Sequence, residues 1–117
     1  MTSSLPTEVS SWTEEACRRA VRDLEAEGRG VSHVYGYAPW PDHVNRRCVD
    51  FMLSPVSRVR WAAAYFERHA VALGVRLMIA DGRIWRAYPK PGLRARRWHR
   101  YWGKNKHRDH VHVEFDR

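Results

Sequence analysis

The sequence predicts a single α+β domain in which a small antiparallel sheet carries two main helices packed on one side. Three observations lead to this prediction. Two stretches carry apolar residues at helical spacing, short β-prone runs lie between and after them, and Asp81-Gly82 has the composition of a tight hairpin turn. A chain of 117 residues has room for one ordinary domain, so the domain is expected to span residues 1–117.

The first helix is expected from Trp12 to Glu27, after a loose polar arm at residues 1–10. Ser11-Trp12-Thr13-Glu14 has the spacing of a capping box, in which the first and last side chains bond to free backbone N–H groups at the start of the helix. Apolar residues recur behind this box at helical intervals, and Gly28 and Gly30 end the pattern. The apolar residues are Ala16, Ala20, Val21 and Leu24.

The middle of the chain is expected to contain a loop, a strand and the main core helix. His33 to Asp42 mixes aromatic residues with glycine and proline, which is typical of an irregular loop, and Val49 to Leu53 has the composition of a short strand. The second helix is expected from Pro55 to Leu73, with Gly74 at its end. Its apolar stripe consists of Val59, Ala62, Ala63, Phe66, Ala70 and Leu73.

The C-terminal part is expected to form a hairpin, a long loop and a final strand. Val75 to Ile79 and Ile84 to Ala87 are the two arms of the hairpin, and Tyr88 to Lys106 is a basic, aromatic loop. The final strand is Val111 to Phe115. Its alternation places the apolar residues on one face and His112 on the other.

Composition and charge limit the classes of function. The formal net charge of +8 predicts attraction to a polyanion, which leaves nucleic acid, a membrane surface and anionic cell-wall polymers open. No apolar run is long enough for a spanning helix, and the N-terminus lacks the pattern of a secretory signal. Cys17 and Cys48 are too few for a disulfide framework, so two reduced thiols are expected rather than one bridge.

Side chains that bind metals occur in three segments. These are His43, Asp50 and a cluster at residues 107–112 that ends in His112. Two imidazoles and one carboxylate are typical of a catalytic zinc site, which keeps one position open for water, whereas structural sites usually close with cysteine. Asp50 and His112 each interrupt an apolar strand, where a buried polar group needs a partner. A shared metal would satisfy both.

The same segments resemble motifs of the VanY-like D-alanyl-D-alanine carboxypeptidase family. His43 to Met52 (HVNRRCVDFM) is similar to the HxxGxAxDF segment of that family, and His107 to Val113 (HRDHVHV) is similar to its HxDHVHV segment. The resemblance extends over Tyr35 to Phe115 and is to the actinobacterial and phage members of a group that includes lysostaphin-type and Hedgehog-type domains. It implies a Hedgehog/D-Ala-D-Ala-peptidase-like fold with a zinc cleft on the side of the sheet opposite the helices. It also implies that His43, Asp50 and His112 bind Zn²⁺.

The resemblance implies two candidates for the catalytic acid and base. Carboxypeptidase-like members use the residue three positions before the last ligand, here Asp109, and other branches use the earlier histidine of an HxH pair, here His110. The sequence satisfies both patterns. Asp109 is expected to accept the proton of the attacking water, with His110 or His107 orienting the water or sharing the role.

Three positions depart from the family pattern. Arg46 stands in place of a glycine, and Cys48 in place of a small residue. Ala38 stands where many relatives have an arginine that is thought to stabilise charge on the substrate. Arg47 is therefore expected to take over that role.

The substrate groove is expected beside the second metal-ligand cluster. Trp98 and Trp102 lie among the basic residues of Arg94 to Lys106 and are expected to line this groove together with His107, although core packing is the alternative for any tryptophan here. A basic rim suits the carboxylates of peptidoglycan stem peptides and anionic wall polymers.

Together these features predict a zinc-dependent peptidoglycan peptidase, either a carboxypeptidase or an endopeptidase, that hydrolyses a stem-peptide or cross-bridge amide. The expected protein is a monomer that acts in the cell wall or periplasm after phage-type release or delivery by a carrier, like an endolysin. Its expected partners are peptidoglycan peptides and anionic wall polymers, not nucleic acid or a membrane. The alternatives are a non-catalytic wall-binding zinc domain and a basic aromatic nucleic-acid-binding module.

Overall fold

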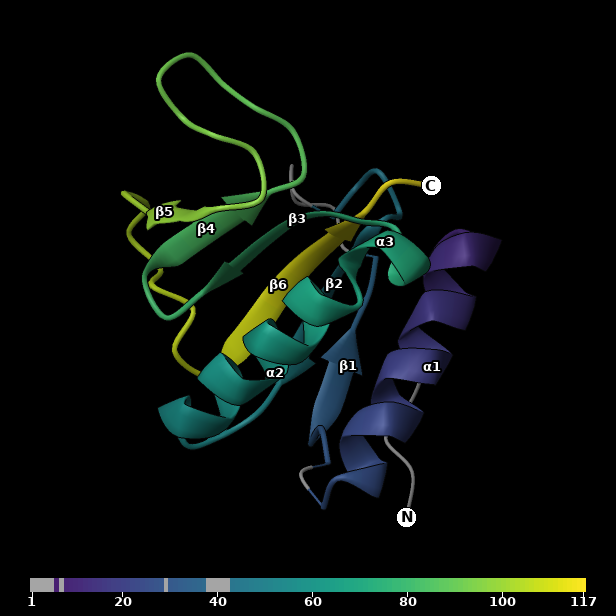
Figure 1. The fold of residues 1–117 in the computed structure, drawn as a ribbon. Coiled ribbons are helices and arrows are strands. Elements are labelled where there is room, and N and C mark those ends of the chain that lie inside the picture. Colours follow the sequence, from purple (N-terminus) through teal and green to yellow (C-terminus); the bar gives the residue numbers. More distant parts are fainter. Residues whose placement is uncertain (1–5, 7, 29, 38–42) are drawn as a thin grey trace.

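The computed structural model describes residues 6, 8–28, 30–37 and 43–117. Three helices and six strands form an α+β fold, as expected (Figure 1). In chain order they are α1 (Ser11–Ala26), β1 (His33–Tyr35), β2 (Cys48–Met52), α2 (Val56–Arg68), α3 (Ala70–Leu73), β3 (Val75–Ala80), β4 (Arg83–Arg86), β5 (Trp98–Arg100) and β6 (His110–Phe115).

The sheet is antiparallel throughout and has the strand order β1-β2-β6-β3-β4-β5. The last strand of the chain therefore lies between β2 and β3, where both of its edges are hydrogen-bonded (Figure 1). This position brings residues near the C-terminus next to residues from the middle of the chain.

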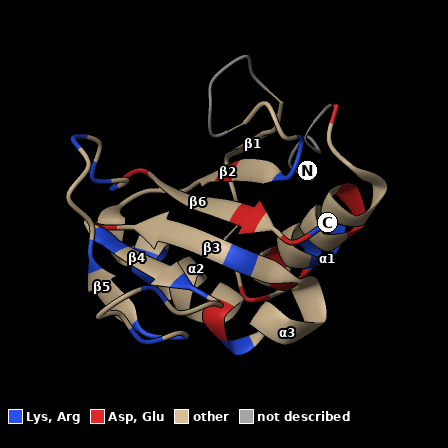
Figure 2. Cartoon of the chain, turned by 90° about the horizontal axis from the view of Figure 1, so that it is seen from above, with Lys and Arg blue, Asp and Glu red and all other residues tan. Residues whose placement is uncertain are grey.

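The helices cover one face of the sheet, and the hydrophobic core lies between these two layers (Figures 1 and 2). Val111, Val113 and Phe115 of β6 are fully buried in this core, as their alternation predicts. Val49 and Phe51 of β2 join them. Burial of each such side chain contributes about 1.5 to 3 kcal/mol, so the core provides most of the stability of the fold.

The first helix begins one residue earlier than expected. Its N-cap is Ser10, whose extended backbone (φ −61°, ψ 157°) lets Oγ accept a hydrogen bond from the Thr13 N–H at 3.2 Å. The prediction of Ser11 as the cap was therefore wrong, because the two serines are adjacent and only the backbone conformation shows that Ser10 caps the helix and Ser11 begins it. Ser10 also donates to the Arg117 carbonyl oxygen at 2.9 Å, so the end of the predicted loose arm is fixed to the C-terminus.

The second predicted helix is divided at His69 into α2 and α3, although its apolar stripe is buried along both parts. Gly74 ends α3 with φ 72°, a left-handed conformation that glycine adopts without strain. A Cβ atom at Gly74 would lie 2.8 Å from both Trp12 Nε1 and an Asp116 oxygen. Glycine is therefore required at this position for two independent reasons.

Two strands lie within segments predicted to be loops. β1 occupies the start of the predicted loop at His33 to Asp42, and residues 38–42 of that loop lie outside the described part of the chain. β5 lies inside the predicted loop at Tyr88 to Lys106 and pairs with β4. Both are short edge strands of three residues, which leave almost no periodic pattern in a sequence.

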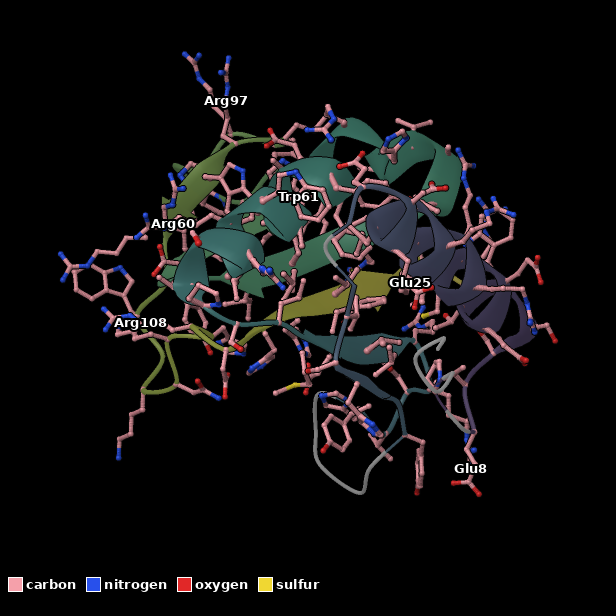
Figure 3. The ribbon with its side chains drawn as sticks, turned by 90° about the horizontal axis from the view of Figure 1, so that it is seen from below. Glu8, Glu25, Arg60, Trp61, Arg97 and Arg108 are labelled. Carbon is pink, nitrogen blue, oxygen red and sulfur yellow. The ribbon has the colours of Figure 1, made fainter. Side chains whose placement is uncertain are left out.

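The hairpin of β3 and β4 is confirmed. Asp81 and Gly82 have φ values of 47° and 75°, the positive values that a tight turn between antiparallel strands requires. Arg60 of α2 and Arg108 contact the Asp81 carboxylate at 2.5 and 3.7 Å and fix the turn against its neighbours (both arginines are labelled in Figure 3).

Cys17 and Cys48 are buried and are not joined by a disulfide, as expected. Within the described residues, no helix combines the length and the apolar character that crossing a membrane requires.

Candidate metal centre

The three residues that the sequence predicts as metal ligands lie on the face of the sheet opposite the helices. Asp50 of β2 and His112 of β6 are directly opposite each other in the strand register. Their neighbours along each strand point into the core, so strand alternation turns Asp50 and His112 to the other face. His43 reaches the same place from the segment before β2.

The three predicted ligands are close enough to bind one ion. His112 Nδ1 lies 2.9 Å from Asp50 Oδ1, and His43 Nε2 lies 3.3 Å from Asp50 Oδ2. One ligand atom from each residue lies within 4.8 Å of the other two. Ligand atoms around a tetrahedral zinc ion at about 2.0 to 2.2 Å are about 3.4 Å apart, so the donor set fits zinc after small side-chain movements.

A backbone hydrogen bond orients His43. Its Nδ1 lies 2.9 Å from the Gly36 carbonyl oxygen, which accepts a hydrogen bond from the ring, and this bond turns Nε2 toward Asp50. Histidine ligands in zinc sites commonly have such a second partner, which fixes the tautomer and the ring orientation. His43 and His112 are 4% and 5% exposed, so their hydrogen-bonding groups are satisfied within the protein or by a ligand.

The Asp50 carboxylate is held in its ionised form. Burial raises its pKa, but hydrogen bonds and charge interactions with His112 and His43 lower the pKa by more, and the net result is well below the usual range. The centre therefore offers one negative carboxylate and two imidazoles, the combination that a divalent cation prefers to bare histidines.

His110 lies between this centre and Asp109. His110 Nδ1 is 2.7 Å from Asp109 Oδ1, and His110 Nε2 is 3.9 Å from Asp50 Oδ1. The side chain of Asp109 is 72% exposed, and its hydrogen bond to His110 lowers the pKa of its carboxyl group. Of the two predicted catalytic residues, His110 thus has the ring nitrogen directed at the metal ligands.

His107 belongs to the same cluster. Its ring centroid is 4.6 Å from that of His110 and 5.8 Å from that of His112. Burial, together with the nearby His110, lowers the pKa of His107 to about 4, so its ring is neutral at physiological pH. Its Nδ1 lies 2.7 Å from the Asn105 carbonyl oxygen, a contact that fixes the orientation of the ring.

The other predicted substrate-binding residues do not all reach this face. Trp98 packs against the core and donates from Nε1 to Glu67 of α2 at 2.9 Å, so it lies on the helical side. The reason is its register opposite Trp85, a core residue. Trp102 is 76% exposed. The Arg47 carbonyl oxygen accepts a hydrogen bond from the Phe115 N–H. Among the described residues, the Arg47 side chain makes no hydrogen bond to the histidine cluster.

Sequence reasoning missed Arg86. It lies on β4 two residues after Ile84, and strand alternation turns both to the face that carries Asp50 and His112. The alternation of Ile84, Trp85 and Arg86 predicts that Ile84 and Arg86 share a face. Only the neighbouring strands show that this is the face opposite the helices.

A search of family models, curated proteins and solved structures finds no match to this chain. The assignment of its function therefore depends on the site itself.

Proposed function

We propose that this protein is a zinc-dependent peptidase of peptidoglycan, which hydrolyses a stem-peptide or cross-bridge amide. One observation carries the proposal: His43, Asp50 and His112 converge from separate segments, with His110 and Asp109 beside them. This donor set leaves an open coordination position, as catalytic zinc sites do. The choice of peptidoglycan as the substrate and of a Hedgehog-like fold rests on the sequence segments that resemble VanY-like peptidases.

A zinc ion bound there would polarise a peptide carbonyl and bring the pKa of a water molecule close to about 7. The residues of the chain supply the rest of the chemistry. His110 Nε2, which faces Asp50 at 3.9 Å, accepts the proton of the attacking water and returns it to the leaving amine. Asp109 binds the opposite nitrogen of the same ring and stabilises its protonated form.

This proposal makes His110 the main acid and base, whereas the sequence pattern favours Asp109 for that role. The contacts support the new order, because Asp109 is the more exposed of the two and is bonded to the side of His110 that faces away from the ligands. His107, neutral and adjacent, is placed to donate or accept a hydrogen bond at the substrate.

The test is digestion of purified muropeptides by zinc-loaded protein, with mass spectrometry of the products. Cleavage at one peptide bond, absent after chelation and restored by zinc, is the expected result. Intact muropeptides at full zinc occupancy would contradict a peptidase and leave the wall-binding zinc domain as the better description, which a pull-down with isolated cell walls then examines.

A nucleic-acid-binding module is the second candidate, and one observation favours it. Arg100 lies 4.1 Å over the ring of Trp102, an exposed aromatic and cation pair of the kind that stacks on bases. Tight oligonucleotide binding at physiological salt that survives His112→Ala would support that module and separate it from the metal centre.

A further inference from the structure

A groove of about 460 Å³ lies on the metal-bearing side of the sheet, toward β5. Its lining includes Ile84, Arg86 and His99 from the strands and Tyr101 and Trp102 from the segment that follows. The strand register joins it to the metal centre, since Asp50, His112, Ile79, Ile84 and His99 are successive neighbours across the sheet. The ring of Tyr101 also lies 5.5 Å from that of His107.

Arg86 is the residue in this groove with an unpaired side-chain donor. Its Nε atom is buried and has no hydrogen-bond acceptor among the described residues. A buried donor without an acceptor is destabilising unless a ligand supplies the acceptor. Two other arginines do have carboxylate partners: Arg76 of β3 contacts Glu114 at 2.6 Å, and Arg60 of α2 contacts Asp81 at 2.5 Å.

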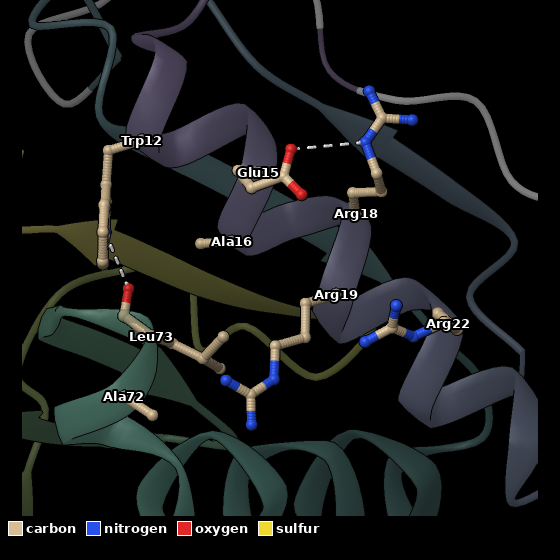
Figure 4. A pocket seen from close by; sticks show the side chains of 8 residues that line it. All are labelled: Trp12, Glu15, Ala16, Arg18, Arg19, Arg22, Ala72 and Leu73. Carbon is tan, nitrogen blue, oxygen red and sulfur yellow. Dashed lines mark hydrogen bonds and ion pairs between the residues drawn. The ribbon is translucent and has the colours of Figure 1, made fainter.

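The groove on the helical side gives a useful contrast. It lies between α1 and α3 and is lined by Trp12, Glu15, Arg18, Arg19 and other residues (Figure 4). Arg18 lies 3.3 Å from Glu14 and 3.6 Å from Glu15, and Arg19 lies 3.8 Å from Asp23. The arginines of that groove are paired with carboxylates of the same helix, so they do not require an anionic ligand.

The position of Arg86 sets the distance between the carboxylate it would bind and the bond that is cleaved. Ile84 is two strands away from His112, and Arg86 is two residues further along β4. With about 4.8 Å between strands and about 3.3 Å per residue, Arg86 lies about 12 Å from His112. An extended peptide covers that distance in about three to four residues.

We propose that this groove is a peptide subsite and that Arg86 is its specificity-determining residue, which binds a carboxylate three to four residues from the hydrolysed bond. The inference rests on the proposed peptidase function and adds its substrate class: an acidic peptide cleaved away from its charged group. A carboxypeptidase that recognises only the terminal carboxylate next to the bond would not need a cation at this distance.

The test compares two synthetic stem peptides that both keep the C-terminal carboxylate. In one the internal carboxyl groups are free, and in the other they are carboxamides. Zinc-loaded wild-type protein is expected to prefer the free acid by about 10 to 100-fold in kcat/KM, mostly through KM, the range for a hydrogen bond between charged groups. Arg86→Gln should remove this preference, and Arg86→Lys should retain part of it.

Arg58→Gln is the matched control, because Arg58 is an exposed arginine of α2 on the helical side. It should keep the full preference of the wild type. Thermal unfolding and zinc content show whether each variant is folded and loaded. Equal kcat/KM for the two peptides in wild-type protein, or an unchanged preference in folded Arg86→Gln, would overturn the subsite.

Calorimetric binding of the same two peptides separates this inference from the peptidase proposal. Preferential binding of the free acid that is lost in Arg86→Gln, without cleavage of either peptide, would retain the subsite and reject the peptidase. Cleavage of both peptides with equal affinities would retain the peptidase and reject the subsite.

Discussion

The two faces of β6 differ in how the burial of their side chains affects the stability of the fold. On the helical face, Val113 and its apolar neighbours are fully buried, and their burial stabilises the fold. On the opposite face, His110 and His112 are almost as well buried, at 7% and 5% exposed, but buried imidazoles stabilise nothing unless they are hydrogen-bonded or bound to a ligand. The same strand therefore contributes core residues from one face and the histidine cluster from the other.

The largest difference between the two faces is expected when two adjacent residues of β6, His112 and Val113, are each replaced by alanine. His112→Ala should lose the zinc ion and all measurable turnover, and His43→Ala and Asp50→Ala should do the same. Val113→Ala should keep about one zinc per chain and its activity while its free energy of unfolding falls by about 2 kcal/mol. Elemental analysis and denaturant unfolding measure both. Zinc retained at full occupancy in His112→Ala would refute the ligand assignment.

The next effect separates the two candidate bases. His110→Ala should keep its zinc and lose about 10² to 10⁴-fold in peptide cleavage, because its ring nitrogen faces the ligands. Asp109→Ala should also keep zinc and lose less, about tenfold, because Asp109 acts through His110. Turnover at matched zinc occupancy between pH 5 and 9 provides the comparison. A dead Asp109→Ala with an active His110→Ala would return the base to the aspartate.

A third prediction concerns the helical face alone. Phe51 packs 4.8 Å from Phe66, centroid to centroid, and is fully buried. Phe51→Ala should lower the free energy of unfolding by about 3 to 5 kcal/mol through the lost burial and the cavity left behind. The remaining folded fraction should still bind zinc, as measured at low temperature with excess metal. Loss of zinc affinity without loss of stability would show that the two faces are not independent.

The smallest effect is expected at the basic end of the molecule (Figure 2). Arg94, Arg96 and Arg97 are exposed, and Arg97 extends into solvent (Figure 3). Replacing all three with glutamine should weaken binding to isolated cell walls by a few-fold and reduce its dependence on salt, because exposed charges are screened over about 10 Å. Zinc content and cleavage of small soluble muropeptides should not change. Binding with unaltered salt dependence would exclude this loop from wall association.

Local patterns in the sequence predicted most of the elements. The stripes of α1 and α2, the turn at Asp81-Gly82 and the alternation of β6 depend on spacings of two to four residues, which any reader of the chain can follow. The sequence also predicted that His43, Asp50 and His112 share one place, and the structure brings them close enough to hold a metal ion. Asp50 and His112 could be recognised because each is a polar side chain in an otherwise apolar strand.

The elements and roles that were missed depend on neighbours far away in the chain. β1 and β5 exist because β2 and β4 offer free edges, and three residues alone carry too little pattern to show it. Trp98 was expected in the substrate groove, yet its pairing with Trp85 turns it to the helices. The order of His110 and Asp109 relative to the ligands also follows from side-chain directions that spacing does not contain.

The sequence by itself determined which residue types are available for a metal and which face of each strand they share, because alternation and side-chain chemistry are local properties. Only the tertiary structure decided that β6 lies between β2 and β3 and that Asp50 therefore meets His112. It also decided that Arg86 Nε is buried with no acceptor in the part of the chain that the structure describes. Strand order and register are set by the packing of the whole core against the helices. The sequence of one strand therefore does not specify which strands pair with it.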